Sequence, residues 1–129
     1  MAILLIAAAA PLALALSVSA HAQDAARLAA GEDAWNKAGC PQCHGADGEG
    51  GTGGESPAGP SLRKTRLDRG ALTETISCGL PGTKMPAWLD GAYKQRPCYG
   101  FSAPPAGMTL FPVLSADEIE QLKKENVIF

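Results

Sequence analysis

Cys40-Pro41-Gln42-Cys43-His44 is the stretch of sequence that decides how this chain folds and what it binds. Two cysteines separated by two residues and followed at once by a histidine form the C-x-x-C-H pattern, which is typical of covalent haem attachment. Two thiols on one helical turn can reach the two vinyl-derived carbons of a porphyrin, while the adjoining imidazole projects toward the iron. The motif therefore predicts one covalent haem c, with Cys40 and Cys43 as attachment sites and His44 as an iron ligand.

Two other interpretations of the motif fit the surrounding sequence less well. A redox-active C-x-x-C pair follows a strand in a βαβ pattern, and no strand is predicted before Cys40. A zinc site needs two more soft ligands at matched spacing. The other cysteines, Cys78 and Cys98, are too far apart in the sequence to supply two zinc ligands at the usual short spacing. Haem attachment remains the favoured interpretation.

Length and charge limit what the rest of the chain can be. The chain has 129 residues, with 11 basic and 13 acidic side chains, so we expect one small domain. There is no basic excess to indicate a nucleic-acid partner. A domain of this size buries only a modest core, and a bound haem would add apolar mass to it.

The first 22 residues contain no Asp, Glu, Lys or Arg and are mostly apolar. They end in Ala20-His21-Ala22, the small-x-small pattern that precedes a signal-peptidase site. We therefore expect residues 1–22 to be a cleaved signal peptide and residues 23–129 to be an exported, periplasmic domain without a membrane anchor. An uncleaved anchor is the alternative. A signal peptide normally begins with a basic residue, and no Lys or Arg precedes this apolar run. A start codon upstream of Met1 is therefore a further alternative.

Three helices are predicted around long loops. The first spans residues 24–39, with Asp24 as N-cap, Gly39 as the stop, and one apolar face formed by Ala25, Leu28, Ala29 and Trp35. The second spans residues 71–79. The third begins at a capping box in which Ser115 is followed three residues later by Glu118.

The segments between these helices are poor in regular-structure signals. Residues 45–61 are dominated by glycine, and residues 86–112 contain Pro86, Pro97, Pro104, Pro105 and Pro112. We therefore expect an all-α fold of about three to four helices joined by long loops.

Two methionines are candidates for the second axial position of the iron. Met85 follows a short predicted helix and precedes Pro86, which fixes the backbone, whereas Met108 lies in a proline-rich loop. Met85 is the favoured ligand, and the alternative for either residue is plain core packing.

A wider pattern of residues now resembles the bacterial class I monohaem cytochromes c over nearly all of residues 24–129. The resemblance is carried by Gly31, Trp35, the C-x-x-C-H motif, Gly59-Pro60-Ser61-Leu62, Lys84-Met85-Pro86-Ala87-Trp88, Leu114-Ser115, Glu118-Ile119 and Leu122. It implies His44 and Met85 as axial ligands, Pro60 with its carbonyl toward the His44 ring, and Trp88 among the haem-binding residues.

The resemblance also implies an activity. With both axial positions occupied, the iron has no open site for a substrate, so we expect a monomeric one-electron carrier rather than an enzyme. Its partners would be a donor and an acceptor redox protein, such as a periplasmic dehydrogenase or a respiratory complex, met transiently. The alternatives are a tightly bound cytochrome subunit of a periplasmic dehydrogenase and, less favoured, a haem enzyme or sensor with a labile Met85. The last would need a distal acid or base, and His44 is the one histidine left after signal cleavage.

Two features depart from the small members of that family. Residues 89–113 form a long insertion, and Cys78 and Cys98 are not needed for haem attachment. In an oxidising compartment the simplest outcome is a Cys78–Cys98 disulfide, and two free thiols are the alternative.

The sequence allows more than one role for the aromatic side chains of residues 88–113 and for the basic residues between Leu62 and Met85. Trp88, Tyr93, Tyr99, Phe101 and Phe111 could form a lid, a docking surface or simple filling beside the haem. Arg63, Lys64, Arg66, Arg69 and Lys84 could steer a partner or be ordinary solvated surface.

Overall fold

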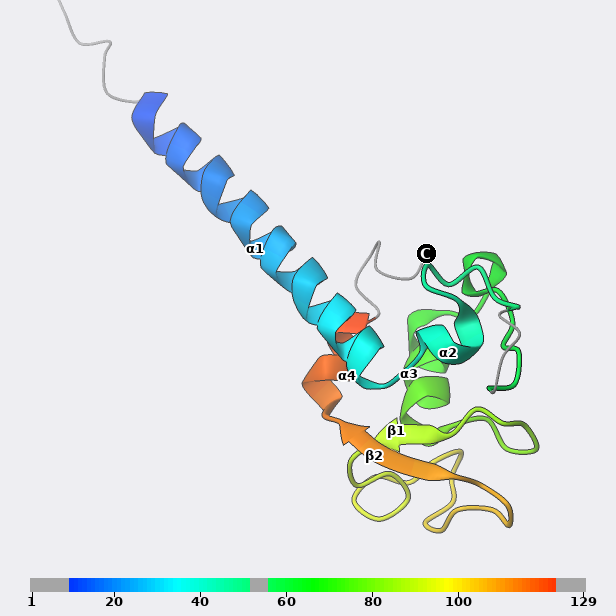
Figure 1. Cartoon of the computed structure of the whole chain (residues 1–129). Coiled ribbons are helices and arrows are strands. Elements are labelled where there is room, and N and C mark those ends of the chain that lie inside the picture. Colours follow the sequence, from blue (N-terminus) through cyan, green and yellow to red (C-terminus); the bar gives the residue numbers. More distant parts are fainter. Residues whose placement is uncertain (1–9, 52–55, 123–129) are drawn as a thin grey trace, which may run out of the picture.

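The computed structural model describes residues 10–51 and 56–122, which form a mainly helical fold with one small sheet (Figure 1). In chain order, the elements are α1 (Ala10–Lys37), α2 (Pro41–His44), the 3-10 turn η1 (Leu62–Lys64), α3 (Arg69–Cys78), β1 (Ala87–Leu89), β2 (Leu110–Leu114) and α4 (Ala116–Leu122). The three predicted helices correspond to α1, α3 and α4.

The expectation of an all-α fold is wrong in one respect, because β1 and β2 pair in parallel as a two-stranded sheet. Both strands lie in the segment whose prolines predicted irregular structure. Pro86 precedes β1, where it interrupts no ladder bond, and Pro112 lies in β2, which pairs with a single neighbour among the described strands. Proline is tolerated in such an edge strand because its missing N–H can face away from the partner.

Helix α1 is longer than the sequence indicated. It spans Ala10–Lys37, so Asp24 lies within the helix and does not cap it. The predicted apolar face is also wrong in part: Ala25, Leu28 and Ala29 are exposed. From residue 21 on, where the structure describes burial, the helix buries only its last turns, in which Ala34 and Trp35 enter the core. It ends before Gly39, which has φ +69°.

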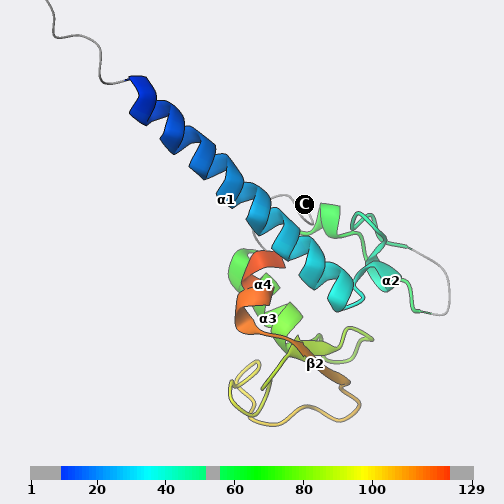
Figure 2. The ribbon, with the colours of Figure 1, turned by 60° about the vertical axis from the view of Figure 1, so that its left-hand side comes forward.

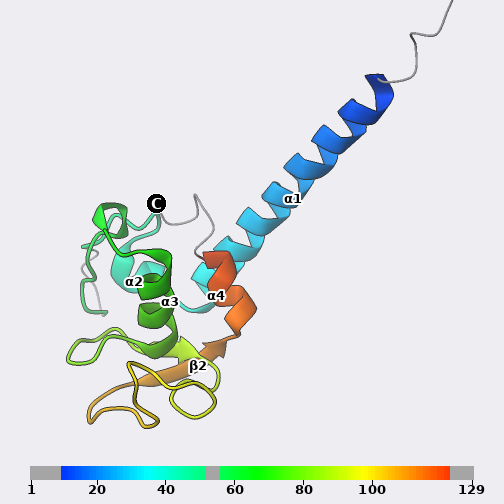
Figure 3. The ribbon, with the colours of Figure 1, turned by 180° about the vertical axis from the view of Figure 1, so that it is seen from behind.

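The predicted signal cleavage stays a prediction, since α1 runs without interruption through Ala22–Gln23. The first part of α1 projects away from the other elements in each of three views (Figures 1, 2 and 3). Cleavage there would leave the buried turns of α1 intact. Within the two described ranges, no helix combines the length and the apolar character needed to cross a membrane.

The core is formed where the end of α1 meets α4 and where α3 packs against α4 and β1 (Figure 2). Its largest fully buried side chains are Tyr93, Leu114, Ile119, Leu122, Cys78 and Cys98. Ile119 and Leu122 are three positions apart on α4, so one face of this short helix enters the core. The core therefore joins the two ends of the domain and also includes part of the insertion.

The insertion, residues 89–113, is fixed to the end of α3. Cys78 and Cys98 form a disulfide, as predicted, across a sequence separation of 20 residues. In the chain-entropy model, closing a loop of this length stabilises a fold by about 3 kcal/mol. The Tyr93 hydroxyl donates to the carbonyl of Cys78 at 3.0 Å, and Arg96 pairs with Glu74. Tyr93 therefore fills the core beside the disulfide, whereas the sequence-based interpretations placed it in a lid, in a docking surface or beside the haem.

The capping box predicted at Ser115 is present at the start of α4. The N–H of Glu118 donates to Ser115 Oγ at 3.2 Å, and the N–H of Ser115 donates to a carboxylate oxygen of Glu118 at 2.8 Å. The same carboxylate accepts from Lys37 Nζ of α1 at 2.7 Å, so it links the two terminal helices. These donors lower the pKa of Glu118 from 4.5 to about 2, with the Lys37 hydrogen bond as the largest cause.

We predict that Glu118→Gln destabilises the domain by about 1 kcal/mol at neutral pH, because it removes a surface ion pair and weakens a cap. The depressed pKa means that the carboxylate stabilises the fold fully above about pH 4.5, and that this contribution is lost as the pH falls toward about 2. The difference in melting temperature between wild type and variant should therefore shrink over that interval. Glu32→Gln, on the exposed side of α1, is the control and should show no such trend. A difference that stays constant down to pH 2 would contradict the assignment.

Candidate functional site

Two adjoining cavities lie between α1 and α2 on one side and α3 with the loop after it on the other. Their volumes are about 590 Å³ and about 250 Å³, and both are lined by Cys40, His44, Pro60, Leu80 and Met85. The larger cavity also has a mainly apolar wall, formed by Trp35, Leu62, Leu67, Leu72, Ile76 and Leu122. The structure thus brings the C-x-x-C-H motif together with Pro60 and Met85, which lie in two separate loops later in the chain.

His44 is held in a defined orientation at the end of α2. Its side chain is buried, and its Nδ1 lies 2.9 Å from the carbonyl oxygen of Pro60. A carbonyl can only accept, so Nδ1 carries the hydrogen and donates it. The other ring nitrogen, Nε2, is left with a lone pair that can bind a metal. The contact expected from the family resemblance is therefore present.

Gly59 explains how Pro60 comes so close to His44. The N–H of Gly59 donates to the carbonyl of Cys43 at 2.7 Å, which clamps the loop onto α2. A Cβ at position 59 would lie 2.8 Å from His44 Nδ1 and 2.9 Å from the Cys43 carbonyl oxygen. Only glycine permits this approach without displacing the imidazole or the backbone. The described part of the glycine-rich segment is thus a fixed loop without helix or strand until η1, while residues 52–55 lie outside the description.

The two motif cysteines are free thiols beside His44. Cys40 lines both cavities and Cys43 lines the smaller one. Burial raises the pKa of the Cys40 thiol from 9.0 to about 12. A redox-active cysteine needs the opposite change, because the thiolate is the reactive form. The environment of Cys40 therefore argues against a redox-active C-x-x-C pair.

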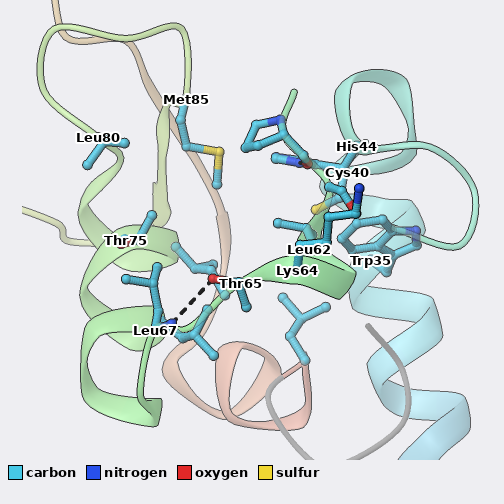
Figure 4. Close-up of a pocket in the computed structure, with 15 residues that line it drawn as sticks. Trp35, Cys40, His44, Leu62, Lys64, Thr65, Leu67, Thr75, Leu80 and Met85 are labelled. Carbon is cyan, nitrogen blue, oxygen red and sulfur yellow. Dashed lines mark hydrogen bonds between the residues drawn. The ribbon is translucent and has the colours of Figure 1, made fainter. Parts of the chain in front are cut away.

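Met85 lies on the wall opposite His44. Figure 4 shows Met85 and Leu80 on one side of the pocket and His44, Cys40 and Trp35 on the other. Within this loop the N–H of Leu80 donates to the carbonyl of Met85 at 3.0 Å, and the N–H of Met85 donates to Thr83 Oγ1 at 3.1 Å. Met108 instead packs against the core and is not among the residues that line either cavity.

Gly79 fixes the base of the loop that carries Met85. It has φ +70°, and a Cβ there would lie 2.7 Å from the N of Ala87 and 2.8 Å from the carbonyl oxygen of Met85. A side chain would thus be strained by the backbone conformation and would also clash with the two backbone groups. This close packing positions Met85 directly beyond the end of α3.

The remaining predicted residues are distributed around the rim. Trp88 lines the smaller cavity, and its ring stacks on Phe111 with centroids 5.7 Å apart. Lys64 and Lys84 each line one cavity. Arg63 pairs with Asp47 at 3.6 Å, so it is less available to a partner than the sequence indicated.

Sequence reasoning missed most of the apolar wall. Leu62, Leu67, Leu80 and Leu122 were not assigned to a site, and neither were Leu72 and Ile76 of α3, which lie four positions apart. Leu67 and Leu80 come from loops, where no periodicity marks the buried side. Leu67 and Leu80 are exposed at the cavity, so a flat apolar group bound there would cover them.

These residues fit a haem. An imidazole whose Nδ1 is already hydrogen-bonded faces a thioether across an apolar cavity, and two free thiols lie beside the imidazole. Together, the mainly helical fold and this donor set define a c-type cytochrome, an electron-transfer haem protein.

Comparison with known protein families agrees with that class. Residues 26–96, just over half of the chain, match the family model described as "Cytochrome C oxidase, cbb3-type, subunit III", and the chain belongs to this family. Residues 97–122 of the described chain lie beyond the match. No curated protein and no solved structure matches the chain.

We predict that Gly59→Ala disturbs the site more than the fold, because its methyl group would press on His44 and Cys43. The expected result is a shifted and broadened Soret band in the haem-loaded protein, together with a lower melting temperature. Gly70→Ala is the matched control, since Gly70 lies in α3 and an added Cβ there would come no closer than 3.3 Å to its nearest neighbour atom, Asp68 Oδ1. That variant should keep the wild-type spectrum. Identical spectra for wild type and Gly59→Ala would contradict the assigned role of Gly59.

Proposed function

We propose that this chain is a periplasmic c-type cytochrome that carries one covalent haem c and passes single electrons between a donor and an acceptor protein. The observation that supports this most directly is the arrangement of His44 and Met85 on facing walls of one apolar cavity, with Cys40 and Cys43 beside His44. A haem supplies the one-electron redox chemistry. The protein supplies attachment, axial ligands and an apolar environment.

Each site residue has a separate part in this proposal. Cys40 and Cys43 would form the thioether bonds, and His44 would ligate the iron through Nε2. Pro60 would keep the imidazole in that orientation through its carbonyl, and a hydrogen bond of this kind raises the basicity of the ligand. Met85 would supply the second ligand, and a thioether ligand raises the reduction potential. Trp88 would pack beside the bound group as part of the smaller cavity.

The proposed ligand set favours a carrier over an enzyme. With protein ligands in both axial positions, the iron offers no site at which a substrate could bind. His44 is also the one histidine between residues 23 and 129, and its ring is already committed to Pro60 and the cavity. A general acid or base of the usual kind is therefore not available.

Two features support an exported, periplasmic protein. The apolar segment of residues 1–22 ends in a small-x-small pattern, and cysteine pairs such as Cys78–Cys98 persist in oxidising compartments. A tightly bound subunit of a larger redox complex is the second candidate. It uses the same chemistry and differs in residence time, so native size-exclusion chromatography from the source cells separates the two.

Covalent attachment is tested by haem staining of a denaturing gel. Wild-type protein from cells with a cytochrome maturation system should keep its stain, because thioether bonds survive unfolding. The Cys40→Ser, Cys43→Ser double variant should lose the stain. Cys78→Ser with Cys98→Ser is the matched control and should keep it, although its melting temperature should fall. An unstained wild-type protein, produced beside a working cytochrome, would show that this chain does not attach haem covalently.

Axial ligation is tested by the weak far-red absorption of a thioether bound to iron(III). We predict that Met85→Ala abolishes this band, whereas Met108→Ala leaves it unchanged. The reason is that Met85 lines both cavities and Met108 packs against the core. Haem staining of both variants checks that attachment is intact. Loss of the band in Met108→Ala alone would move the ligand to Met108.

A further inference from the structure

Residues 97–116 form a run without a charged side chain, and most of this run is exposed. It contains no Asp, Glu, Lys, Arg or His. Apart from Cys98, Pro105, Met108 and Leu114, every residue in it is exposed to solvent. A solvated loop of this length normally carries charges, so solubility alone does not account for this composition.

Large apolar side chains are concentrated on the same segment. We define the uncharged surface as Tyr99, Phe101, Leu110, Phe111 and Val113. Phe101 is 61% exposed, Phe111 50% and Val113 40%. The strand β2 and the loop before it lie together at the end of the molecule remote from the start of α1 (Figures 1 and 3). Such concentrations of exposed apolar side chains mark interaction sites.

The uncharged surface is held rigidly. Tyr99 donates from its hydroxyl to the carbonyl of Gly79 at 2.7 Å, and its N–H donates to a carboxylate oxygen of Glu74 at 2.7 Å. The adjacent Cys98 is bonded to Cys78, and β2 pairs with β1. A surface ordered in advance loses little conformational entropy on binding, which favours association.

One aromatic pair connects this surface to the candidate haem site. Phe111 stacks on Trp88 with an interplanar angle of 29°, and Trp88 lines the smaller cavity together with His44 and Met85. Between a protein that contacts Phe111 and the cavity there would therefore be the stacked rings of Phe111 and Trp88.

We propose that the uncharged surface is the docking site for a redox partner protein that presents an apolar, uncharged patch. This inference rests on the proposed electron-transfer function. In the complex, the partner's reduced centre loses one electron and this cytochrome gains it, or the reverse, and no bond is made or broken. Docking on Phe111 brings the partner to the Trp88 side of the cavity.

The chemistry of the surface selects this occupant over four others. An anionic lipid surface attracts clusters of basic residues, and residues 97–116 contain none. A second copy of the chain has the same reduction potential, so pairing would cover Phe111 without net electron flow. Strand addition along β2 is disfavoured because Pro112 lacks an N–H. A charged patch on a partner would lose its hydration here without gaining an opposite charge.

Photo-crosslinking in the source cells tests the occupant. A photoreactive phenylalanine analogue replaces Phe101 in the full chain, and a matched variant carries it at Lys94, an exposed and charged position of the same insertion. Irradiation should join position 101, but not position 94, to one protein that mass spectrometry identifies as carrying a haem, flavin, copper or iron–sulfur centre. Crosslinks to a second copy, to lipid, or at equal yield from both positions would each overturn the proposal.

Electron transfer with the identified partner, followed by stopped flow, is the second arm. Phe101→Asp should lower the second-order rate constant at least tenfold, because it places a charge in an apolar contact. Lys94→Asp should change it less than twofold. The wild-type rate should vary little between about 50 mM and about 500 mM salt, since no charge on this surface is screened. Equal rates for wild type and Phe101→Asp, or a steep salt dependence, would overturn the proposal.

The proposed function and the docking site fail separately in these experiments. Haem staining and the far-red band of Phe101→Asp report on the cytochrome itself, and both should match wild type. If they match while the rate is unchanged, the docking site is wrong and the cytochrome stands. If the stain is missing from wild type as well, the electron-transfer function fails first.

Discussion

The hydrogen bond from His44 to the carbonyl of Pro60 is the interaction on which the site depends. At 2.9 Å it fixes the tautomer and the plane of the imidazole, and it leaves Nε2 for a metal. It forms only because Gly59, without a side chain, lets the loop approach the imidazole and the Cys43 carbonyl. The glycine-rich composition of this segment therefore reflects close packing against α2 rather than the freedom of a linker.

The parts of the fold that the sequence predicted are those with a local physical signal. The capping box at Ser115 and the helix stop at Gly39 depend on neighbouring residues, and the structure confirms both. The motif cysteines likewise place His44 beside the cavity. The start of α1 was misplaced, since Asp24 as a cap is a weak signal within a run of good helix formers.

The sheet and the apolar wall could not be read from the sequence, because both depend on contacts between distant residues. Ala87 of β1 pairs with Leu110 of β2 across the whole insertion, and no periodicity in a three-residue strand foretells this. Leu67 and Leu80 enter the cavity wall from loops. Cys78 and Cys98 were paired correctly because they are the two cysteines outside the C-x-x-C-H motif, which leaves few alternatives.

The end of α3 connects the loop that carries Met85 with the uncharged surface. Cys78 is bonded to Cys98 of the insertion, and the next residue, Gly79, packs against the backbone of Met85 while its carbonyl accepts from the Tyr99 hydroxyl. Two consecutive residues therefore anchor both segments. A displacement of the insertion by a bound partner would act on the end of α3 through the Cys78–Cys98 disulfide and the Tyr99 hydroxyl, next to the backbone that holds Met85. The disulfide limits that displacement, so the insertion can present an apolar surface close to the site while Met85 stays in position.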